Sequence, residues 1–312
     1  HPHAASTGGT DPKWWTLVAV CTGVFMLLLD ITIVNVALPD IQTDLDASLS
    51  DLQWVIDAYA LSLAALLLTA GSLADLYGRR RVFMIGLVIF TLGSVACGAS
   101  QDVVLLCVSR ALQGIGGAAM FATALALLAS AFHGRDRGVA FGAFGATTGV
   151  AVAVGPVLGG VLTSGLSWRW IFFVNVPICL VALAVSGWRV KESHDPRAGR
   201  PDWIGFVTFS TALGALVFGL IEAGQKTWTD PVVLASLIAS AVLLAIFVLS
   251  QVRQRQPMFD LGLLAKPTFT GGLIAAFGVS ASIFSLLAYL VIYVQNVLDY
   301  SAVQTGLRFL FL

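Results

Sequence analysis

Three ionisable residues lie within long apolar stretches of the sequence: Asp30, Asp57 and Arg110. A charged side chain near the bilayer centre costs about 2.5–3.5 kcal/mol on insertion scales, so these groups should face the protein interior and partner one another or water. Desolvation favours a protonated carboxyl group, a nearby arginine opposes this, and a cationic ligand can replace the proton. The three residues therefore predict a proton and cation coupling site. The alternative is an ion pair that only holds helices in register.

The segments that carry these residues are long enough to cross a membrane. The chain has 312 residues, of which 58% are hydrophobic and 11% charged, whereas about a quarter are charged in soluble domains. A spanning helix needs about 20 apolar residues. Such segments cover residues 14–38, 52–74, 82–99, 103–132, 138–162, 168–190, 203–221, 232–252 and 269–297. We therefore expect an all-α, polytopic membrane protein.

The basic residues predict which helix ends face the cytoplasm. With the N-terminus inside, most of the 17 Lys and Arg residues fall in the inner loops, and the outer loops hold only Arg169 and Lys226. Cytoplasmic loops retain Lys and Arg. We therefore expect a multi-pass protein of the cell membrane, in bacteria the inner membrane, with a cytoplasmic N-terminus.

A short charged stretch, GSLADLYGRRR, joins the second and third expected spans. Gly71 and Gly78 allow a turn, Asp75 can accept hydrogen bonds, and Arg79 and Arg80 anchor the inner face. The residue types predict a tight hairpin that acts as an inner gate. As a topology signal alone, the arginines need no further role.

The fourth span presents a polar strip beside Arg110. Gln113, Gly114 and Gly117 lie three, four and seven residues further along and share its helix face. The fragment GIGGAA in this span also matches a nucleotide-binding glycine pattern, but it lies in an apolar helix with no strand before it. We therefore expect neither nucleotide binding nor a nucleic-acid partner.

Glycines and a proline cluster in the fifth span, at Gly149, Gly155, Pro156, Gly159 and Gly160. Small residues at helical spacing allow close packing of a partner helix, and a Gly-Pro pair bends the helix. This pattern predicts a hinge that moves during a conformational cycle. Packing alone explains it equally well.

The remaining candidates are weaker. Aromatic residues Phe25, Tyr59, Phe121 and Phe144 could line a substrate cavity, although packing or lipid contact explains each of them as well. All four histidines lie outside the spans, and the four cysteines lie within them as small buried hydrophobes. Nucleophile and zinc-protease motifs are absent from the sequence. We therefore expect no enzyme, no metal site and no cofactor, with a proton gradient as the energy source.

Together these motifs resemble the major facilitator superfamily, and more narrowly its fourteen-helix drug/proton antiporters of the EmrB/QacA type. GSLADLYGRRR resembles the superfamily's motif between helices two and three, LCVSRALQGIGGAA its helix-four motif, and GPVLGG its antiporter motif. LDITIVNVALP and WRWIFFVNVP are similar to signatures of the fourteen-helix branch. Leu76 departs from the pattern, where a basic residue is common.

The resemblance implies a role for each matching residue. It places Asp75 and Arg79 in the inner gate, Arg110 in proton coupling, Asp30 in cation or proton handling, and Gly155 and Pro156 in the antiporter hinge. Substrate sites in this fold lie between two helix bundles near the membrane midplane.

The resemblance also implies a domain organisation. It divides the chain into a cytoplasmic tail (1–13), an N-terminal six-helix bundle (14–190), a cytoplasmic linker (191–202), an extra helix pair (203–252), and an interfacial connection with the first helix of an incomplete C-terminal bundle (253–312). The chain stops inside an apolar run, so we expect a C-terminal truncation. The C-terminal bundle of the full-length protein is then a partner.

The function that we expect is proton-coupled export, by antiport, of amphipathic and often cationic drugs or toxic compounds. The partners are a small amphipathic substrate, protons and membrane lipid. Two alternatives stay open: an exporter of the same fold for a specific metabolite or siderophore, and a non-transporting membrane sensor or scaffold.

Overall fold

The computed structural model describes residues 12–194, 202–254, 257, 259–298, 300 and 304. All regular structure in these residues is helical. The elements are α1 (Pro12–Leu45), α2 (Leu49–Tyr77), α3 (Arg79–Gly98), α4 (Val103–Ala131), α5 (Gly134–Gly165), α6 (Trp170–Phe173), α7 (Asn175–Arg189), α8 (Trp203–Gln225), α9 (Pro231–Arg253), the 3-10 helix η1 (Leu261–Ala265) and α10 (Pro267–Asn296). Within the described residues, eight helical segments are long and apolar enough to span a membrane. The expected all-α membrane fold is confirmed.

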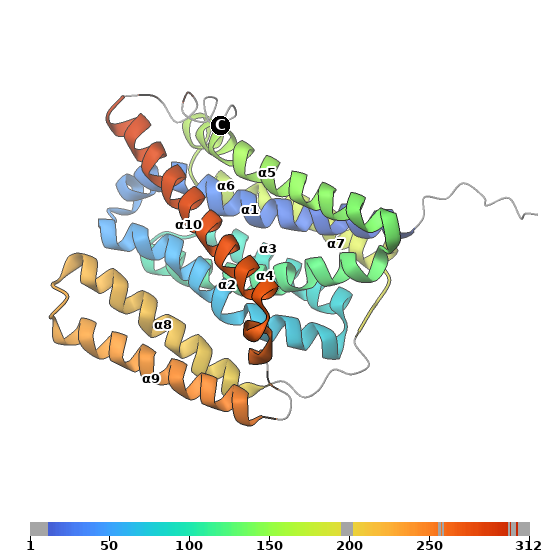
Figure 1. The fold of residues 1–312 in the computed structure, drawn as a ribbon. Coiled ribbons are helices and arrows are strands. Elements are labelled where there is room, and N and C mark those ends of the chain that lie inside the picture. Colours follow the sequence, from blue (N-terminus) through green and yellow to red (C-terminus); the bar gives the residue numbers. More distant parts are fainter. Residues whose placement is uncertain are drawn as a thin grey trace, which may run out of the picture.

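Helices α1 to α7 pack into one bundle (Figure 1). Helix α4 packs against α2 and α3, and α1 packs against α5 and α7. Two clusters of buried apolar side chains form the core, and along α1 they meet between Leu29, in the first cluster, and Ile33, in the second. Asp30 lies at this junction, so a charge is enclosed between two apolar clusters.

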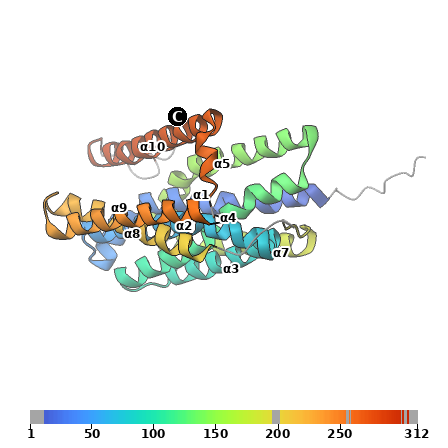
Figure 2. The ribbon, with the colours of Figure 1, turned by 60° about the horizontal axis from the view of Figure 1, so that its bottom comes forward.

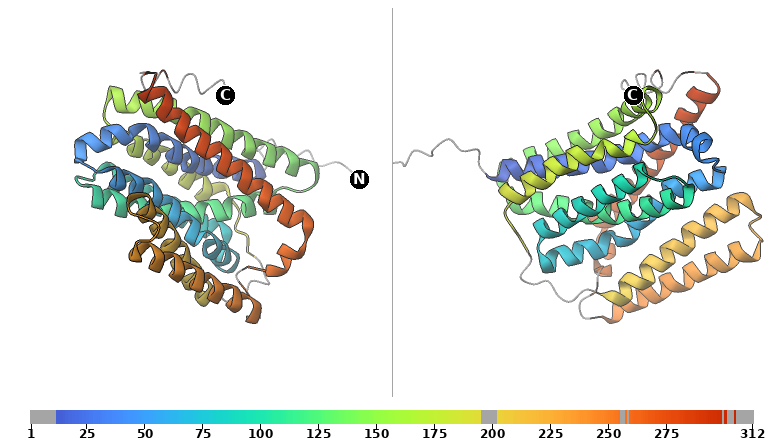
Figure 3. Two further views of the ribbon diagram at one scale, coloured as in Figure 1. Left: turned by 60° about the vertical axis from the view of Figure 1, so that its left-hand side comes forward. Right: turned by 180° about the vertical axis from the view of Figure 1, so that it is seen from behind.

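The α8–α9 hairpin lies at one edge of the bundle, against α2 (Figure 3). The Ser210 hydroxyl donates to the Ala65 carbonyl at 3.1 Å, and the rings of Trp54 and Phe218 lie 6.3 Å apart. Helix α10 lies apart from this hairpin (Figure 2), and the described side chains of its N-terminal half are largely exposed.

The hairpin between the second and third spans is tighter than expected. Helix α2 continues to Tyr77 and α3 begins at Arg79, so Gly78 alone makes the turn, with φ +110°. Gly71 lies inside α2, and the prediction that it allows the turn is wrong. The leucines after Gly71 are good helix formers and continue the helix, whereas a positive φ suits glycine and ends it.

The span expected at 168–190 is divided into α6 and α7, with Val174 between them. Pro177 has no N–H group, so the Phe173 carbonyl loses its usual helical donor four residues ahead. The interruption places Asn175 in the first turn of α7, in the interior of the bundle.

Candidate functional site

Asp30 of α1 and Arg110 of α4 form an ion pair inside the bundle. Arg110 Nη1 lies 2.5 Å from Asp30 Oδ2, and the two side chains are 2% and 0% exposed. A buried charge is costly unless it is paired and hydrogen bonded. The pairing therefore lets two charges remain within the apolar bundle.

Two amides complete the surroundings of the Asp30 carboxylate. Gln113 Nε2 donates to Asp30 Oδ1 at 2.8 Å, and Asn175 Nδ2 donates to the same oxygen at 2.9 Å. Both amides also donate to Ser94 Oγ, at 2.8 and 3.2 Å. An ionised carboxylate only accepts hydrogen bonds. A shell made of donors therefore fits Asp30 in its ionised form.

The guanidinium of Arg110 also donates further hydrogen bonds and contacts two aromatic rings. Its Nη1 donates to Gln113 Oε1 at 2.7 Å and its Nε to the Val55 carbonyl at 3.1 Å. The guanidinium carbon lies 4.3 Å from the ring centre of Tyr59 and 5.8 Å from that of Phe172, within cation–π range. Six helices, α1, α2, α3, α4, α6 and α7, therefore meet at this one ion pair.

Glycines allow the helices to approach closely enough for these contacts. A Cβ on Gly93 of α3 would lie 2.8 Å from Gln113 Cα, and one on Gly86 would lie 2.9 Å from the Gly116 carbonyl oxygen. Such distances exclude a larger residue, because packed cores cannot absorb the overlap. The close approach of α3 to α4 brings Ser94 within hydrogen-bonding distance of Gln113.

Ser94 and Asn175 belong to the site, although the sequence patterns did not predict them. Asn175 belongs to the stretch WRWIFFVNVP, and an amide within an apolar span is the signal that could have identified it. Tyr59 was expected to line a substrate cavity, but the structure places it in the ion-pair site, 2% exposed, with its hydroxyl donating to the Leu27 carbonyl at 3.4 Å.

The other predicted residues of the binding machinery lie apart from the ion pair. Asp57 is half-buried on α2, and within the described residues it has neither a hydrogen bond nor an ion pair. Phe25, Phe121 and Phe144 are partly buried and pack against the first apolar cluster. The structure therefore joins Asp30 to Arg110 and leaves Asp57 outside their network.

The predicted gate residues Asp75 and Arg79 form an ion pair of their own. Arg79 Nη2 and Nε lie 2.8 and 3.0 Å from Asp75 Oδ1. Arg80 points to the end of α7, where its Nε donates to the Ser186 carbonyl at 2.9 Å and its Nη2 donates to the Gly187 carbonyl. The arginine thus satisfies carbonyl groups that a helix C-terminus leaves free.

Glu192 provides the reverse contact, from the segment after α7 to the start of α3. Its carboxylate accepts from the backbone N–H of Arg80 at 2.9 Å and of Arg81 at 3.2 Å. A Cβ on Gly78 would lie 2.6 Å from the Glu192 carboxyl carbon. The N-terminus of α3 and the C-terminus of α7 therefore cap each other, and the sequence offered no sign of this pairing.

Two of the predicted hinge glycines mark the contact between α5 and α1. A Cβ on Gly155 would overlap the Thr32 side chain, and one on Gly159 would lie 3.0 Å from the Ile33 carbonyl oxygen. Gly160 is also buried, and Pro156 lies within the continuous helix α5. Gly149 is exposed, with open space where a Cβ would be. The close contact thus follows directly after Asp30 on α1.

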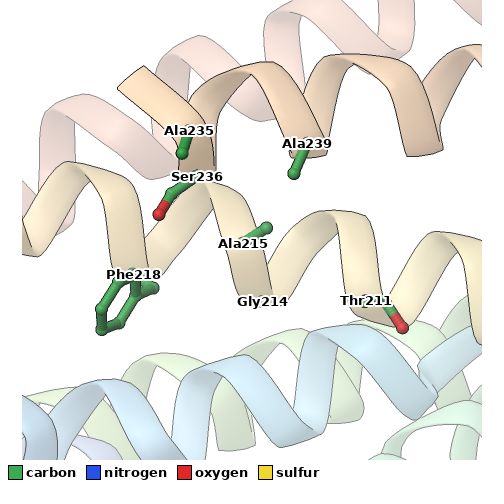
Figure 4. Close-up of a pocket in the computed structure, with 7 residues that line it drawn as sticks. All are labelled: Thr211, Gly214, Ala215, Phe218, Ala235, Ser236 and Ala239. Atoms are coloured by element: carbon green, nitrogen blue, oxygen red, sulfur yellow. The ribbon is translucent and has the colours of Figure 1, made fainter. Parts of the chain in front are cut away.

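A hollow of about 510 Å³ lies between α8 and α9 (Figure 4). Small side chains leave it open. It is lined by Thr211, Gly214, Ala215, Phe218, Ala235, Ser236 and Ala239. No ionisable side chain is among these lining residues.

Comparison with known proteins connects this architecture to a family. Residues 20–312 match the profile of the Major Facilitator Superfamily. The chain belongs to the Major Facilitator Superfamily. It is 39% identical over 309 residues to the puromycin resistance protein pur8 of Streptomyces alboniger, an alignment that covers 98% of this chain and 61% of that protein.

Other relatives of this superfamily member carry similar names. The multidrug resistance protein Stp of Mycobacterium tuberculosis is 39% identical, with 95% of this chain and 55% of Stp covered. The tetracenomycin C resistance and export protein of Streptomyces glaucescens is 37% identical, with 99% and 57% covered. The chain spans 55 to 61% of the length of these relatives.

A solved structure supports the fold. A peptide transporter POT in complex with sulfate superposes with a TM-score of 0.65 at 16% identity, covering 99% of this chain and 68% of that one. This likeness shows the major facilitator fold and no more.

Proposed function

We propose that the full-length protein exports amphipathic, often cationic, drugs or toxic compounds across the cytoplasmic membrane in exchange for protons. The observation that carries the proposal is the buried carboxylate of Asp30, paired with Arg110 and surrounded by donors. Such a group holds its charge only while these donors stay in place. Protonation breaks the pairing, and the energy of that change is available to rearrange the helices that meet there.

The relatives support drug export as the transported class. Their names refer to multidrug resistance, to puromycin resistance, and to resistance and export of tetracenomycin C. The motifs that resemble the fourteen-helix EmrB/QacA type support antiport in particular. In this proposal α8 and α9 are the extra helix pair, and the C-terminal bundle completes the substrate cavity.

The Asp30→Asn substitution in the full-length protein tests proton coupling. Asparagine has nearly the same shape but takes up no proton, so we expect dye efflux driven by a pH gradient to disappear in everted vesicles. The control is Asp44→Asn on the same helix, which removes an exposed ion pair with Arg169 at 2.7 Å. Exposed pairs contribute about 0–1 kcal/mol. Unchanged efflux in the Asp30 variant contradicts the proposal.

A second candidate is the export of one specific metabolite by the same mechanism. It is favoured by relatives named for single antibiotics, such as the methylenomycin A resistance protein of Bacillus subtilis, which is 33% identical. A substrate panel separates the two. Efflux of several unrelated cationic dyes supports the broad exporter, and efflux of one compound class alone supports the narrow one.

We also propose roles for the predicted residues outside the ion pair. Asp57 is a second proton site, and its half-buried position on α2 allows it to exchange protons more readily than Asp30. Asp75, Arg79 and Arg80 form half of an inner gate on the cytoplasmic side.

One proton per monocation moves no net charge, whereas a second proton adds about 2.3 kcal/mol per 100 mV of membrane potential. Efflux by Asp57→Asn that no longer responds to membrane potential would support the second site.

A further inference from the structure

The Asn175 side chain has one polar atom without a partner. Its Nδ2 donates to Asp30 Oδ1 and to Ser94 Oγ, whereas its Oδ1 has no hydrogen-bond partner in the described part of the chain. The residue is 0% exposed. An unsatisfied buried acceptor is destabilising, so its presence requires an explanation.

The charge of Asp30 explains why the amide faces this way. An ionised carboxylate accepts hydrogen bonds and donates none, so only the nitrogen of the Asn175 amide can face it. A protonated carboxyl group has a different need. Its O–H is a donor, and in a buried site it requires an acceptor.

We propose that Asn175 is a positioning residue for Asp30 in both protonation states, its amide turning by half a rotation when the carboxyl group gains or loses its proton. Nδ2 donates to the ionised carboxylate, and Oδ1 accepts from the protonated carboxyl group. The inference rests on the proposed function, because it requires Asp30 to take up and release a proton during transport.

Asn175 can turn, whereas Gln113, the other amide, is locked. Gln113 Oε1 accepts from Arg110 Nη1 at 2.7 Å and from Cys97 Sγ at 3.7 Å. A turn would place its NH₂ group against the guanidinium donors. Asn175 Oδ1 has no hydrogen-bond partner in the described residues. The amide therefore has one unpartnered polar atom before the turn, and one after it. The Ser94 hydroxyl can accept from Nδ2 or donate to Oδ1, so the protonation state of Asp30 selects the orientation.

Asp30 takes up one proton and releases one proton in each cycle. A proton from water on the outer side forms an O–H bond on the Asp30 carboxyl group, the pairing with Arg110 weakens, and the proton later leaves to water on the inner side. The titratable or charged groups that face Asp30 are Arg110 from α4, Tyr59 from α2, Cys97 from α3 and Cys179 from α7. Helix α5, which also packs on α1, has its ionisable residues at 135–137, in its first turn.

Infrared difference spectroscopy of the reconstituted full-length protein tests this directly. Acidification produces the carbonyl stretch of a protonated carboxyl group, and the part of that signal lost in Asp30→Asn belongs to Asp30. In Asn175→Leu, which is similar in size but has no polar atom, we expect the Asp30 band to shift to higher wavenumber as its hydrogen bond is lost.

The matched control is Ser186→Ala, about three turns further along α7, whose buried hydroxyl donates to the Ala182 carbonyl at 2.7 Å; in this variant we expect an unchanged Asp30 band. If Asn175→Leu does not fold, Asn175→Asp replaces it, since it has the same shape and its second carboxyl group must also displace the band. An Asp30 band that is the same in the Asn175 variant and the wild type overturns the inference and leaves proton coupling intact. The absence of any Asp30 band in the wild type overturns proton coupling itself.

Discussion

Arg110 contacts five groups with one planar guanidinium: the Asp30 carboxylate, the Gln113 amide oxygen, the Val55 carbonyl and the rings of Tyr59 and Phe172. A lysine ammonium is a point charge without this fork or this face. At the scale of the single residue, the chemistry of the site therefore depends on arginine and not merely on positive charge.

Removing Arg110 should destabilise the protein, because Arg110 compensates the buried charge of Asp30. We expect Arg110→Ala to lower the free energy of unfolding by about 3–5 kcal/mol, because Asp30 remains buried and unpaired. Adding Asp30→Asn should restore part of that loss. The measurement is thermal unfolding of the two single variants and the double variant in detergent. If the loss of stability in the double variant equals the sum of the losses in the two single variants, the two side chains do not interact.

At the scale of the helices, two contacts control how the bundle can move. The start of α3 and the end of α7 cap each other through Arg80 and Glu192. Helices α1 and α5 touch through Gly155 and Gly159, directly after Asp30. A change in the charge of Asp30 therefore acts next to a close helix contact, whereas the start of α3 and the end of α7 are held together.

The Glu192 contact predicts a local effect on α3. We expect Glu192→Ala to increase hydrogen exchange of the amides of Arg80 and Arg81, since they lose their acceptor, and to cost about 0.5–2 kcal/mol, as other helix N-terminal caps do. Exchange is measured by mass spectrometry. The control is Glu222→Ala, which breaks an i,i+4 pair with Lys226 at the C-terminal end of α8. Equal protection at the start of α3 in both variants would refute the cap.

The α1–α5 contact predicts opposite effects of two glycine substitutions. We expect Gly155→Ala to destabilise the protein by about 1–3 kcal/mol, because the new methyl group overlaps Thr32. Gly149→Ala meets open space and should be neutral or stabilising by up to about 1 kcal/mol through helix propensity. The melting temperatures of the two variants check this. A Gly155→Ala variant as stable as Gly149→Ala would mean that α5 does not pack on α1 as described.

At the scale of the whole molecule, the structure gathers basic residues at one end. Lys13 at the start of α1 pairs with Asp136 at the start of α5 at 3.0 Å, and Arg79 and Arg80 lie at the start of α3 beside the end of α7. Because basic loops stay in the cytoplasm, we propose that this end lies inside.

Cysteine labelling tests that orientation. In a background without the four native cysteines, we expect Lys226→Cys, in the turn between α8 and α9, to react with an impermeant maleimide in intact cells. Arg137→Cys, at the start of α5, should react only after the membrane is opened. Labelling of Arg137→Cys in intact cells would reverse the proposed orientation.

The sequence by itself determined the helical membrane fold, the place of the hairpin between the second and third spans, and the inward-facing, partnered positions of Asp30 and Arg110. Hydrophobic length and the cost of an intramembrane charge are properties of one segment or one residue, so they can be assessed without knowing any neighbour. Only the tertiary structure decided the partners. Asn175 lies 145 positions from Asp30 along the chain, and Glu192 lies 112 positions from Arg80. Which side chains meet depends on how the helices are rotated and how closely their glycines let them pack, and neither is a local property of the sequence.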